Sequence, residues 1–395
     1  MVKRLMRQNL NNGIQGSNQI DVRERNERLV LTILRYQGAL PKAEIARKTG
    51  LSAQTTSVIM RSLEDEGLLE KCEKVRGKIG QPSIPMQLSP GGVYFFGLKV
   101  GRRSIELVLV DFTGTVLEYR KQTYKYPTPD RTIEFAKMNV AEILEKYSKK
   151  DGFRIGGLGI ALPYFLWEWA SVIGVKDEEM AAWKDCDLVH EFSAYFDFPI
   201  LLGNDASCAC GAELVFGNSD LPSEFLYLYF GYFIGGGVVI GNRLFTGPSG
   251  NSGALGPLPI DGVNGNQKQL IDIASLGSLE RNLLTTGEDS EAIWSNNEEW
   301  NINPDYIEEW LQEIIPATAH AIASAVSIID FPTILVDGSM PSQYVDEIVT
   351  RLKLYLDEFN MSGLVKPEIQ SGSLGVRARP LGAASLPLAD KYLLN

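Results

Sequence analysis

Cysteine and histidine are scarce in this sequence, whose 395 residues include four cysteines and two histidines. Four scattered cysteines cannot build the disulfide framework of a small secreted domain. Cys208 and Cys210 stand two residues apart in a stretch expected to be helical, so their side chains point in different directions. This spacing is more typical of small core residues than of metal ligands. The sequence therefore predicts neither disulfides nor a thiolate metal site.

Long apolar runs are missing as well. No stretch is long enough to cross a membrane, and residues 1–17 are polar and rich in asparagine, unlike a secretory signal. Hydrophobic residues make up 44% of the chain and charged residues 22%, as in ordinary globular proteins. We expect a cytoplasmic protein with no membrane partner, in which residues 1–20 are disordered.

The charge is unevenly distributed along the chain. Residues 1–90 hold 15 Lys and Arg against 9 Asp and Glu, a balance of +6, and taking this from the total of −11 leaves −17 for residues 91–395. A small basic segment before a large acidic one indicates that only the N-terminal part meets a polyanion. A solvated basic face would produce the same balance.

The first 90 residues contain three helical patterns. Apolar residues recur at helical spacing from 29 to 34, and a short helix beginning near Pro41 stops in a turn that contains Gly50. Ser52 is expected to cap a third helix over residues 53–66. Two short helices joined by a glycine turn are typical of a helix-turn-helix motif. The apolar residues expected to face inward from the third helix are Val58, Ile59 and Leu63.

The start of the third helix carries short hydrogen-bonding side chains, and an arginine follows one turn later. Such side chains suit base edges and phosphates. Strands expected over residues 68–74 and 83–88 flank a basic loop, which would form a wing. Winged helix-turn-helix modules can also be plain interaction domains, but the basic balance favours DNA. The predicted DNA-binding residues are Ser52, Gln54, Thr55, Thr56, Ser57, Arg61, Arg76, Lys78 and Gln81.

From residue 91 the pattern becomes α/β. Strands are expected over residues 93–99, 104–110 and 116–121, then a helix over 132–147 and a strand over 157–162 that ends at Pro163. Hairpin-joined strands of this kind open the actin-like, sugar-kinase type of domain. The aromatic residues that follow could stack on a sugar or belong to the core; they are Trp167, Trp169 and Trp183.

Asn204 and Asp205 fall at a strand-to-helix junction, between the apolar residues 199–202 and the small and apolar residues 206–216. Ligands of open α/β sheets bind at such junctions. An aspartate there can accept a proton from a substrate hydroxyl or hold a sugar hydroxyl. The common alternative is that Asp205 only caps the following helix.

Glycine-rich segments follow at residues 231–237 and 249–257, and a turn at Asp337 and Gly338 follows the strand expected over 333–336. Glycine lets backbone N–H groups approach phosphates, although a tight hairpin needs glycine too. A long helix is expected over residues 307–329, with Pro316 kinking or breaking it. A final helix is expected from about Leu381 to Tyr392.

Taken together, these motifs resemble the ROK family of repressors, open reading frames and kinases over almost the whole chain. Gly97–Asp111 is similar to the first phosphate motif, Gly203–Glu213 to the stretch with the catalytic aspartate, Gly231–Gly237 to the second phosphate motif, and Val336–Ser339 to the adenosine-side turn. The resemblance implies an α/β fold. A winged helix-turn-helix over residues 21–90 would precede an actin-like, ribonuclease H-like body of two lobes over residues 91–395.

Several residues depart from the kinase pattern of this family. Lys99 stands where the resemblance implies an aspartate, two arginines follow Gly101, and Tyr232 and Phe233 would crowd a nucleotide phosphate. ATP-dependent phosphorylation is therefore not expected, and Asp205 becomes a vestigial base. The vestigial phosphate loops are marked by Gly101, Gly235, Gly236, Gly237 and Gly338.

The zinc and sugar positions of the family also differ. Ala254 and Pro257 stand where the resemblance implies a glutamate and a histidine, and no cysteine follows them. No zinc or other cofactor is expected, and the effector should differ from glucose and N-acetylated amino sugars unless the pocket is vestigial. The predicted effector-binding residues are Asn204, Asp205, Pro163, Glu179, Trp183 and Asn251.

The sequence thus predicts a DNA-binding transcriptional regulator of the repressor type, controlled by a small carbohydrate-like effector. A homodimer or homotetramer is expected, because paired heads would read a two-fold operator in double-stranded DNA. Two alternatives remain: an active sugar kinase with an accessory DNA-binding head, and a constitutive DNA binder whose body only oligomerises.

Overall fold

The computed structural model describes residues 19–73, 84–218, 220–261, 267–295 and 299–394. The chain forms two compact units, one of Met1–Cys208 with Pro380–Asn395 and the other of Ala209–Arg379. The predicted disorder of the N-terminus falls almost wholly outside the described residues. Every helix in the described part of the chain is too short or too polar to cross a membrane.

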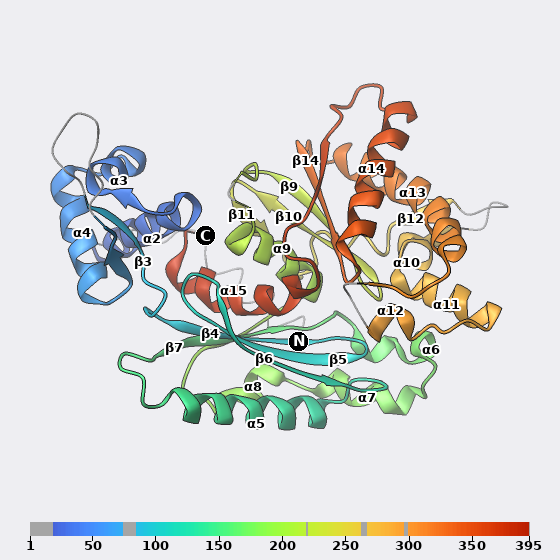
Figure 1. Cartoon of the computed structure of the whole chain (residues 1–395), viewed down its shortest axis with the longest axis horizontal. Coiled ribbons are helices and arrows are strands. Elements are labelled where there is room, and N and C mark those ends of the chain that lie inside the picture. Colours follow the sequence, from blue (N-terminus) through green and yellow to red (C-terminus); the bar gives the residue numbers. More distant parts are fainter. Residues whose placement is uncertain (1–18, 74–83, 219, 262–266, 296–298, 395) are drawn as a thin grey trace. The chain divides into compact units, whose positions relative to one another are not determined.

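The N-terminal head of the first unit is a winged helix-turn-helix (Figure 1). Its elements are α2 (Gln19–Gln37), β1 (Leu40–Pro41), α3 (Lys42–Thr49), α4 (Ala53–Asp65), β2 (Leu69–Lys71) and β3 (Pro85–Leu88). The strands pair antiparallel in the order β1-β3-β2. The helices pack together because each turns an apolar stripe inward. The buried residues include Val30, Leu34, Ile45, Ile59 and Leu63.

The rest of the first unit is built on a mixed sheet. Its elements are β4 (Tyr94–Val100), β5 (Ser104–Val110), β6 (Val116–Thr123), α5 (Pro129–Tyr147), β7 (Ile155–Ala161), η1 (Leu166–Glu168), α6 (Ala170–Ile173), α7 (Asp177–Asp185), α8 (Leu188–Ser193), β8 (Ile200–Gly203) and α15 (Ala378–Tyr392). The strand order is β6-β5-β4-β7-β8, with β4, β7 and β8 parallel. Helices α5 and α15 lie on opposite faces of the sheet (Figure 1).

Helix α15 approaches this sheet closely because two strands offer glycine beneath it. A Cβ at Gly97 would lie 2.2 Å from the Pro380 carbonyl oxygen, and one at Gly159 would lie 1.7 Å from the Ala383 carbonyl oxygen. Any larger residue at either position would push the helix away from the sheet. The C-terminal helix is therefore an integral layer of the first unit.

The second unit is also a mixed sheet between helices. Its elements are α9 (Asp205–Phe216, which begins in the first unit), β9 (Phe225–Phe230), β10 (Ile234–Ile240), β11 (Arg243–Phe245), β12 (Pro259–Asp261), β13 (Gln267–Gln269), α10 (Leu270–Ile273), α11 (Leu276–Thr286), α12 (Ala292–Ser295), α13 (Pro304–Val326), β14 (Thr333–Gly338), α14 (Ser342–Glu358), β15 (Glu368–Ser371) and η3 (Gly375–Arg377). The main sheet has the order β11-β10-β9-β14-β15.

The side chains of β9 point alternately to the two faces of this sheet, because successive side chains of a strand point in opposite directions. Leu226, Leu228 and Phe230 join a large apolar cluster with the helices from α10 to α14. Tyr227 and Tyr229 belong to a second cluster on the opposite face, which includes Ala209 and Cys210 of α9. The central strand is thus buried on both sides.

The structure contradicts two local expectations, a break of the helix at Pro316 and a glycine turn over residues 235–237. Helix α13 runs through Pro316 without ending there. The proline is exposed, whereas neighbours such as Ile314 and Ile315 are buried, so packing of the apolar face holds the helix together. Gly235, Gly236 and Gly237 lie in strand β10, paired with Tyr229, Leu228 and Tyr227, and do not form a turn.

Candidate functional site

The turn into helix α4 is closed by local hydrogen bonds. Gly50 ends α3 in the left-handed conformation at φ 70°, which favours glycine. The Ser52 hydroxyl then accepts a 3.0 Å hydrogen bond from the backbone N–H of Thr55, so Ser52 is the predicted cap of α4. The glycine turn and the serine cap together fix where α3 ends and where α4 begins, as in a helix-turn-helix.

The outward face of α4 contains most of the residues predicted to contact DNA. Gln54, Thr55, Ser57 and Arg61 are all exposed. Arg61 has a long, exposed contact of 3.9 Å with Asp65, which leaves its guanidinium accessible to a phosphate. Helix α4 therefore presents amide, hydroxyl and guanidinium groups on one surface, as a groove-reading helix does.

Two residues of α4 differ in orientation from the prediction. Thr56 is 1% exposed, and its hydroxyl donates a 3.0 Å hydrogen bond to the Ser52 carbonyl oxygen, so it stabilises the helix and does not reach outward. Val58, predicted to face the core, is 60% exposed. The predicted wing contacts Arg76, Lys78 and Gln81 lie outside the described residues.

The head is hydrogen-bonded to the rest of the first unit through arginines. The Arg35 guanidinium donates to the Phe112 carbonyl oxygen and lies 5.4 Å from the centroid of the Phe112 ring. Burial lowers the pKa of Arg35 to about 10, a value still high enough for the guanidinium to be protonated at neutral pH. Arg154 donates to the carbonyl oxygens of Gly92 at 2.7 Å and of Glu66, the C-cap of α4, at 2.9 Å.

The C-terminal helix also meets the head. Arg28 of α2 donates a 2.9 Å hydrogen bond to the Asp390 carbonyl oxygen, and the backbone N–H of Leu394 donates a 3.0 Å bond to the Thr32 hydroxyl. Because α15 lies against the sheet of the first unit, these contacts join α2 to the layer that covers strands β4 and β7. The head and the sheet therefore share a continuous set of contacts.

The predicted junction at Asp205 is confirmed in position. Strand β8 ends at Gly203 and α9 begins at Asp205. The side chain that caps the helix is that of Asn204, whose Oδ1 accepts hydrogen bonds of 3.1 Å from the N–H groups of Ala206 and Ser207. Asp205 itself is half-buried. The helix-capping bonds that the sequence offered as an alternative role for Asp205 are thus made by Asn204.

Pro163 lies at the same sheet edge as this junction. Strands β7 and β8 are parallel, and the N–H of Leu162 donates a 3.0 Å hydrogen bond to the Gly203 carbonyl oxygen. The structure thus brings Pro163, Asn204 and Asp205 together at the carboxyl ends of adjacent strands, where ligands of α/β sheets bind.

The other predicted effector residues are placed differently. Glu179 of α7 accepts a hydrogen bond from the Tyr126 hydroxyl. Trp183 is buried, and its indole N–H donates a 2.9 Å bond to the Pro127 carbonyl oxygen, so it belongs to the core. Asn251 lies in the second unit, in the segment between β11 and β12.

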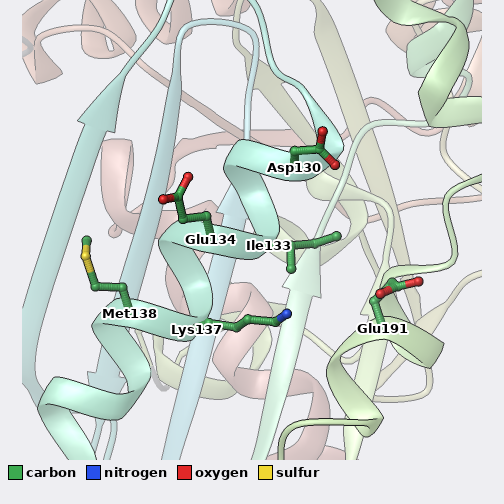
Figure 2. Close-up of a pocket in the computed structure, with 6 residues that line it drawn as sticks. All are labelled: Asp130, Ile133, Glu134, Lys137, Met138 and Glu191. Carbon is green, nitrogen blue, oxygen red and sulfur yellow. The ribbon is translucent and has the colours of Figure 1, made fainter.

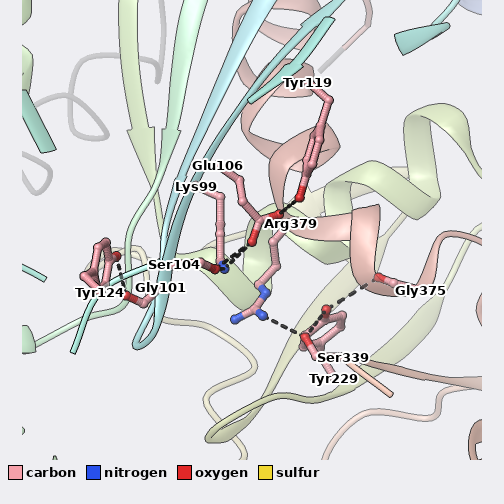
Figure 3. Close-up of polar contacts among 10 residues, drawn as sticks. All are labelled: Lys99, Gly101, Ser104, Glu106, Tyr119, Tyr124, Tyr229, Ser339, Gly375 and Arg379. Atoms are coloured by element: carbon pink, nitrogen blue, oxygen red, sulfur yellow. Dashed lines mark hydrogen bonds and ion pairs between the residues drawn. The ribbon is translucent and has the colours of Figure 1, made fainter. Parts of the chain in front are cut away.

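A buried ion pair occupies the hairpin that resembles the first phosphate motif (Figure 3). The Lys99 ammonium lies 2.8 Å from Oε1 of Glu106 and donates a 2.9 Å hydrogen bond to the Ser104 hydroxyl. The Tyr119 hydroxyl donates a 3.0 Å bond to Oε2 of Glu106. A Cβ at Gly101 would lie 2.6 Å from Nζ of Lys99, so the lysine fills the space against this turn.

In the second unit, two buried carboxyl groups lie at the end of strand β14. Asp337 accepts hydrogen bonds from the N–H groups of Gly338 at 2.7 Å and Gly375 at 3.1 Å. Burial, and then the nearby Glu213 carboxyl, raise the pKa of Asp337 to about 7. Burial also raises the pKa of Glu213, although hydrogen bonds from Ser373 and other groups act in the opposite direction.

Sequence reasoning missed this carboxyl pair. Each residue is an acidic side chain in an otherwise apolar element, Asp337 in residues 333–338 and Glu213 in residues 206–216. That pattern could have marked both as buried and partnered, because an isolated charge in a core is costly. Gly338 ends β14 beside this pair, and a Cβ at this position would lie 2.8 Å from the Phe230 carbonyl oxygen.

A separate polar cluster of the second unit contains Arg379, Ser339 and Tyr229 (Figure 3). Arg379 donates a 2.7 Å hydrogen bond to the Ser339 hydroxyl, and its guanidinium lies 4.9 Å from the centroid of the Tyr229 ring. The hydroxyls of Tyr229 and Ser339 are 2.9 Å apart. This cluster adjoins the turn at Gly231, which opens the segment similar to the second phosphate motif.

A surface hollow of about 620 Å³ lies beside α5 and α8 (Figure 2). Its lining residues are Asp130, Ile133, Glu134, Lys137, Met138 and Glu191. None of the predicted effector residues belongs to it, and its acidic side chains are typical of a solvated face. Within the described residues, no three His, Cys, Asp or Glu side chains gather as metal ligands would.

The head and the body together define a class of protein. Residues 23–70 match a family model described as winged helix-turn-helix DNA-binding. They precede a mixed α/β body of the sugar-kinase type. The chain is thus a DNA-binding transcriptional regulator by class. Residues 95–389 match the model of the ROK family, and the chain belongs to that family.

Individual relatives include regulators and a kinase. The chain is 24% identical to the xylose repressor of Bacillus spizizenii over 245 residues, which cover 62% of this chain and 63% of the repressor. A solved structure described as a ROK family transcriptional regulator, homolog of the E. coli MLC protein, is 18% identical with a TM-score of 0.66 and covers 94% of this chain and 98% of its own.

The kinase among these relatives is a ROK family glucokinase from Streptomyces griseus, solved in complex with glucose and AMPPNP. It is 20% identical to this chain with a TM-score of 0.55, and the match covers 74% of this chain and 98% of the glucokinase. At these identities the structural likeness establishes the fold and not the activity.

Proposed function

We propose that this chain is a transcriptional repressor in which residues 21–90 bind an operator and residues 91–395 bind a small carbohydrate-like effector without phosphorylating it. The observation that carries the proposal is the capped helix α4, which exposes Gln54, Thr55, Ser57 and Arg61 on one face. A solvent-facing helix surface is polar in any protein, but amide and hydroxyl side chains followed by an arginine are the types that contact base edges and phosphates.

The sheet edge at Pro163, Asn204 and Asp205 is the proposed site of the effector. A half-buried aspartate at the carboxyl end of parallel strands can accept hydrogen bonds from sugar hydroxyls. The relative named xylose repressor supports a sugar or a sugar-derived compound as the effector class. The same contacts that join α2 to α15 and the sheet would let the effector bias the arrangement of the heads.

The alternative of an active sugar kinase is disfavoured by Lys99. Its ammonium is paired with Glu106 in a buried site, so the hairpin lacks a carboxylate that is open to organise magnesium and ATP. A coupled ADP-release assay over a panel of sugars tests this point. Turnover that depends on Asp205 would overturn the view that the body is not an enzyme.

The proposed binding of an operator also suggests an oligomeric state and a cellular location for the protein. A two-fold DNA site calls for paired heads, so we propose a homodimer or a homotetramer. We also propose a cytoplasmic location, because a protein that binds operators acts where the DNA is.

The experiment that tests the proposal begins with duplexes selected from a random-sequence pool by the full-length protein. Their affinity is then measured by fluorescence anisotropy with and without sugars, sugar acids and polyols. We expect a selected palindromic duplex and a sugar-class compound that weakens its binding. Asp205→Ala should abolish the effect of the compound and retain DNA binding.

Asp151→Ala serves as the matched control, because Asp151 is an exposed aspartate of the same unit and should leave the response unchanged. A selected duplex that no compound releases would support the constitutive DNA binder. Failure to enrich any sequence would contradict operator binding itself.

A further inference from the structure

Val58 is an apolar side chain at the centre of the reading face. It is 60% exposed, and it lies between Gln54, one turn earlier, and Arg61, one turn later. The buried stripe of α4 is made by Thr56, Ile59, Met60 and Leu63. The inward and outward stripes are thus fully distinct, and Val58 belongs to the outward one.

An exposed valine gains little in the free protein. Valine has a lower helix propensity than alanine, and its two methyl groups remain in water at this position. Its polar neighbours on the same face offer no apolar partner. The feature is explained if the partner of Val58 is external and carries an apolar group.

The major groove of DNA offers one such group. Among the base edges, only thymine presents a methyl group there, at C5, and small apolar side chains make contact with it. A valine in a helix has one strongly preferred χ1 rotamer, so its methyl groups are held in place before binding and lose little freedom on contact. Stiffness and exposure together suit a contact that must recognise a single methyl group.

We propose that Val58 contacts the C5 methyl group of a thymine in each operator half-site and thereby distinguishes thymine from cytosine. The inference rests on the proposed function, because it requires α4 to enter the major groove. Gln54 lies four residues earlier, about 6 Å along the helix axis. Since base pairs are spaced by about 3.4 Å, an adenine read by Gln54 should lie within about two base pairs of this thymine.

The test uses the palindromic duplex selected by the full-length protein. Each thymine is replaced in turn, in both half-sites, by deoxyuridine, which lacks only the methyl group. Wild-type protein should lose about fourfold in affinity for each half-site at one particular position, the effect of one buried methyl-sized group. Val58→Ala should bind the unmodified duplex more weakly and should show no loss at that position.

The matched control is Val365→Ala, because Val365 is 68% exposed in the second unit and outside the head. It should keep the wild-type response to deoxyuridine at every position. Val58→Ala should unfold at the wild-type temperature or slightly above it, since the site is exposed and alanine has the higher helix propensity.

The possible outcomes distinguish failure of the Val58 contact from failure of operator binding. A deoxyuridine effect that disappears in Val58→Ala supports the contact. Insensitivity to deoxyuridine at every thymine, or an effect that persists unchanged in Val58→Ala, overturns the contact while operator binding stands. Failure to select any duplex contradicts the proposed function and takes this inference with it.

Discussion

The hydroxyl of Tyr227 donates a 2.9 Å hydrogen bond to Oδ2 of Asp337, and both side chains are buried. The Asp337 carboxyl also accepts bonds from the backbone of Gly338 and Gly375, with Glu213 as a nearby acidic neighbour. Strand β14 and the segment after β15 are thus joined through one carboxyl group whose protonation changes near neutral pH.

This carboxyl should make the protein less stable as the pH rises. Folding raises the pKa of Asp337 from 3.8 to about 7, so its favourable contribution is complete below pH 3.8 and is lost as the pH rises through about 7. At about 1.4 kcal/mol per pKa unit, the loss is on the order of 4 kcal/mol. Glu213, whose pKa is also raised, acts in the same direction.

Asp337→Asn should therefore flatten the pH dependence of the free energy of unfolding and be more stable than the wild type above pH 7. Urea denaturation at a series of pH values measures this. The exposed Asp330→Asn is the control and should keep the wild-type slope. An unchanged slope in Asp337→Asn would show that this carboxyl is already ionised in the folded protein.

Removing the Lys99 ammonium should be costly. Lys99→Met removes the ammonium that lies 2.8 Å from the buried Glu106 carboxylate, and loss of one partner of a buried pair costs about 3–5 kcal/mol. Adding Glu106→Gln should recover most of this, because glutamine is neutral, its amide oxygen can accept from Ser104, and its amide N–H can donate to the Tyr119 oxygen.

Urea denaturation of the single and double variants measures the recovery. The control is Lys366→Met at the exposed pair with Asp357, where we expect a change of less than about 1 kcal/mol. Additive losses in the Lys99 and Glu106 variants would argue that the two side chains are not energetically coupled.

Arg61 should act on DNA through a phosphate. Arg61→Ala should weaken binding to all duplexes by a similar factor and reduce the slope of log K against log salt by about 1. Anisotropy titrations at several salt concentrations measure the slope. Arg243→Ala removes an exposed arginine of the second unit and should leave it unchanged. A sequence-selective loss in Arg61→Ala would instead assign the residue to base readout.

Arg35 should hold α2 against the segment at Phe112. Arg35→Met keeps an apolar stem but removes the guanidinium that donates to the Phe112 carbonyl oxygen, at a cost of about 1–3 kcal/mol. Amide hydrogen exchange in α2 should accelerate by about 10- to 100-fold, and exchange in β14 should not change. Arg25→Met, at an exposed position of the same helix, is the control. Equal exchange in both variants would exclude this role for Arg35.

Local patterns in the sequence were sufficient to predict the order of the main helices and strands. Apolar periodicity and the glycine turn identified the helix-turn-helix, and a strand followed by small residues located the junction at Asp205, because both patterns depend only on neighbours in the chain. The uneven charge separated a basic head from an acidic body for the same reason. The family resemblance followed from the order of these motifs.

Tertiary packing decided what the local patterns left open. Each helical residue is rotated by about 100° from the last, so only the packed structure establishes that Thr56 is buried and Val58 exposed. Burial of neighbouring apolar residues carries α13 through Pro316. Asp337 and Glu213 are far apart in the sequence, and only the fold brings them into one buried site, where the loss of water makes their protonation sensitive to each other.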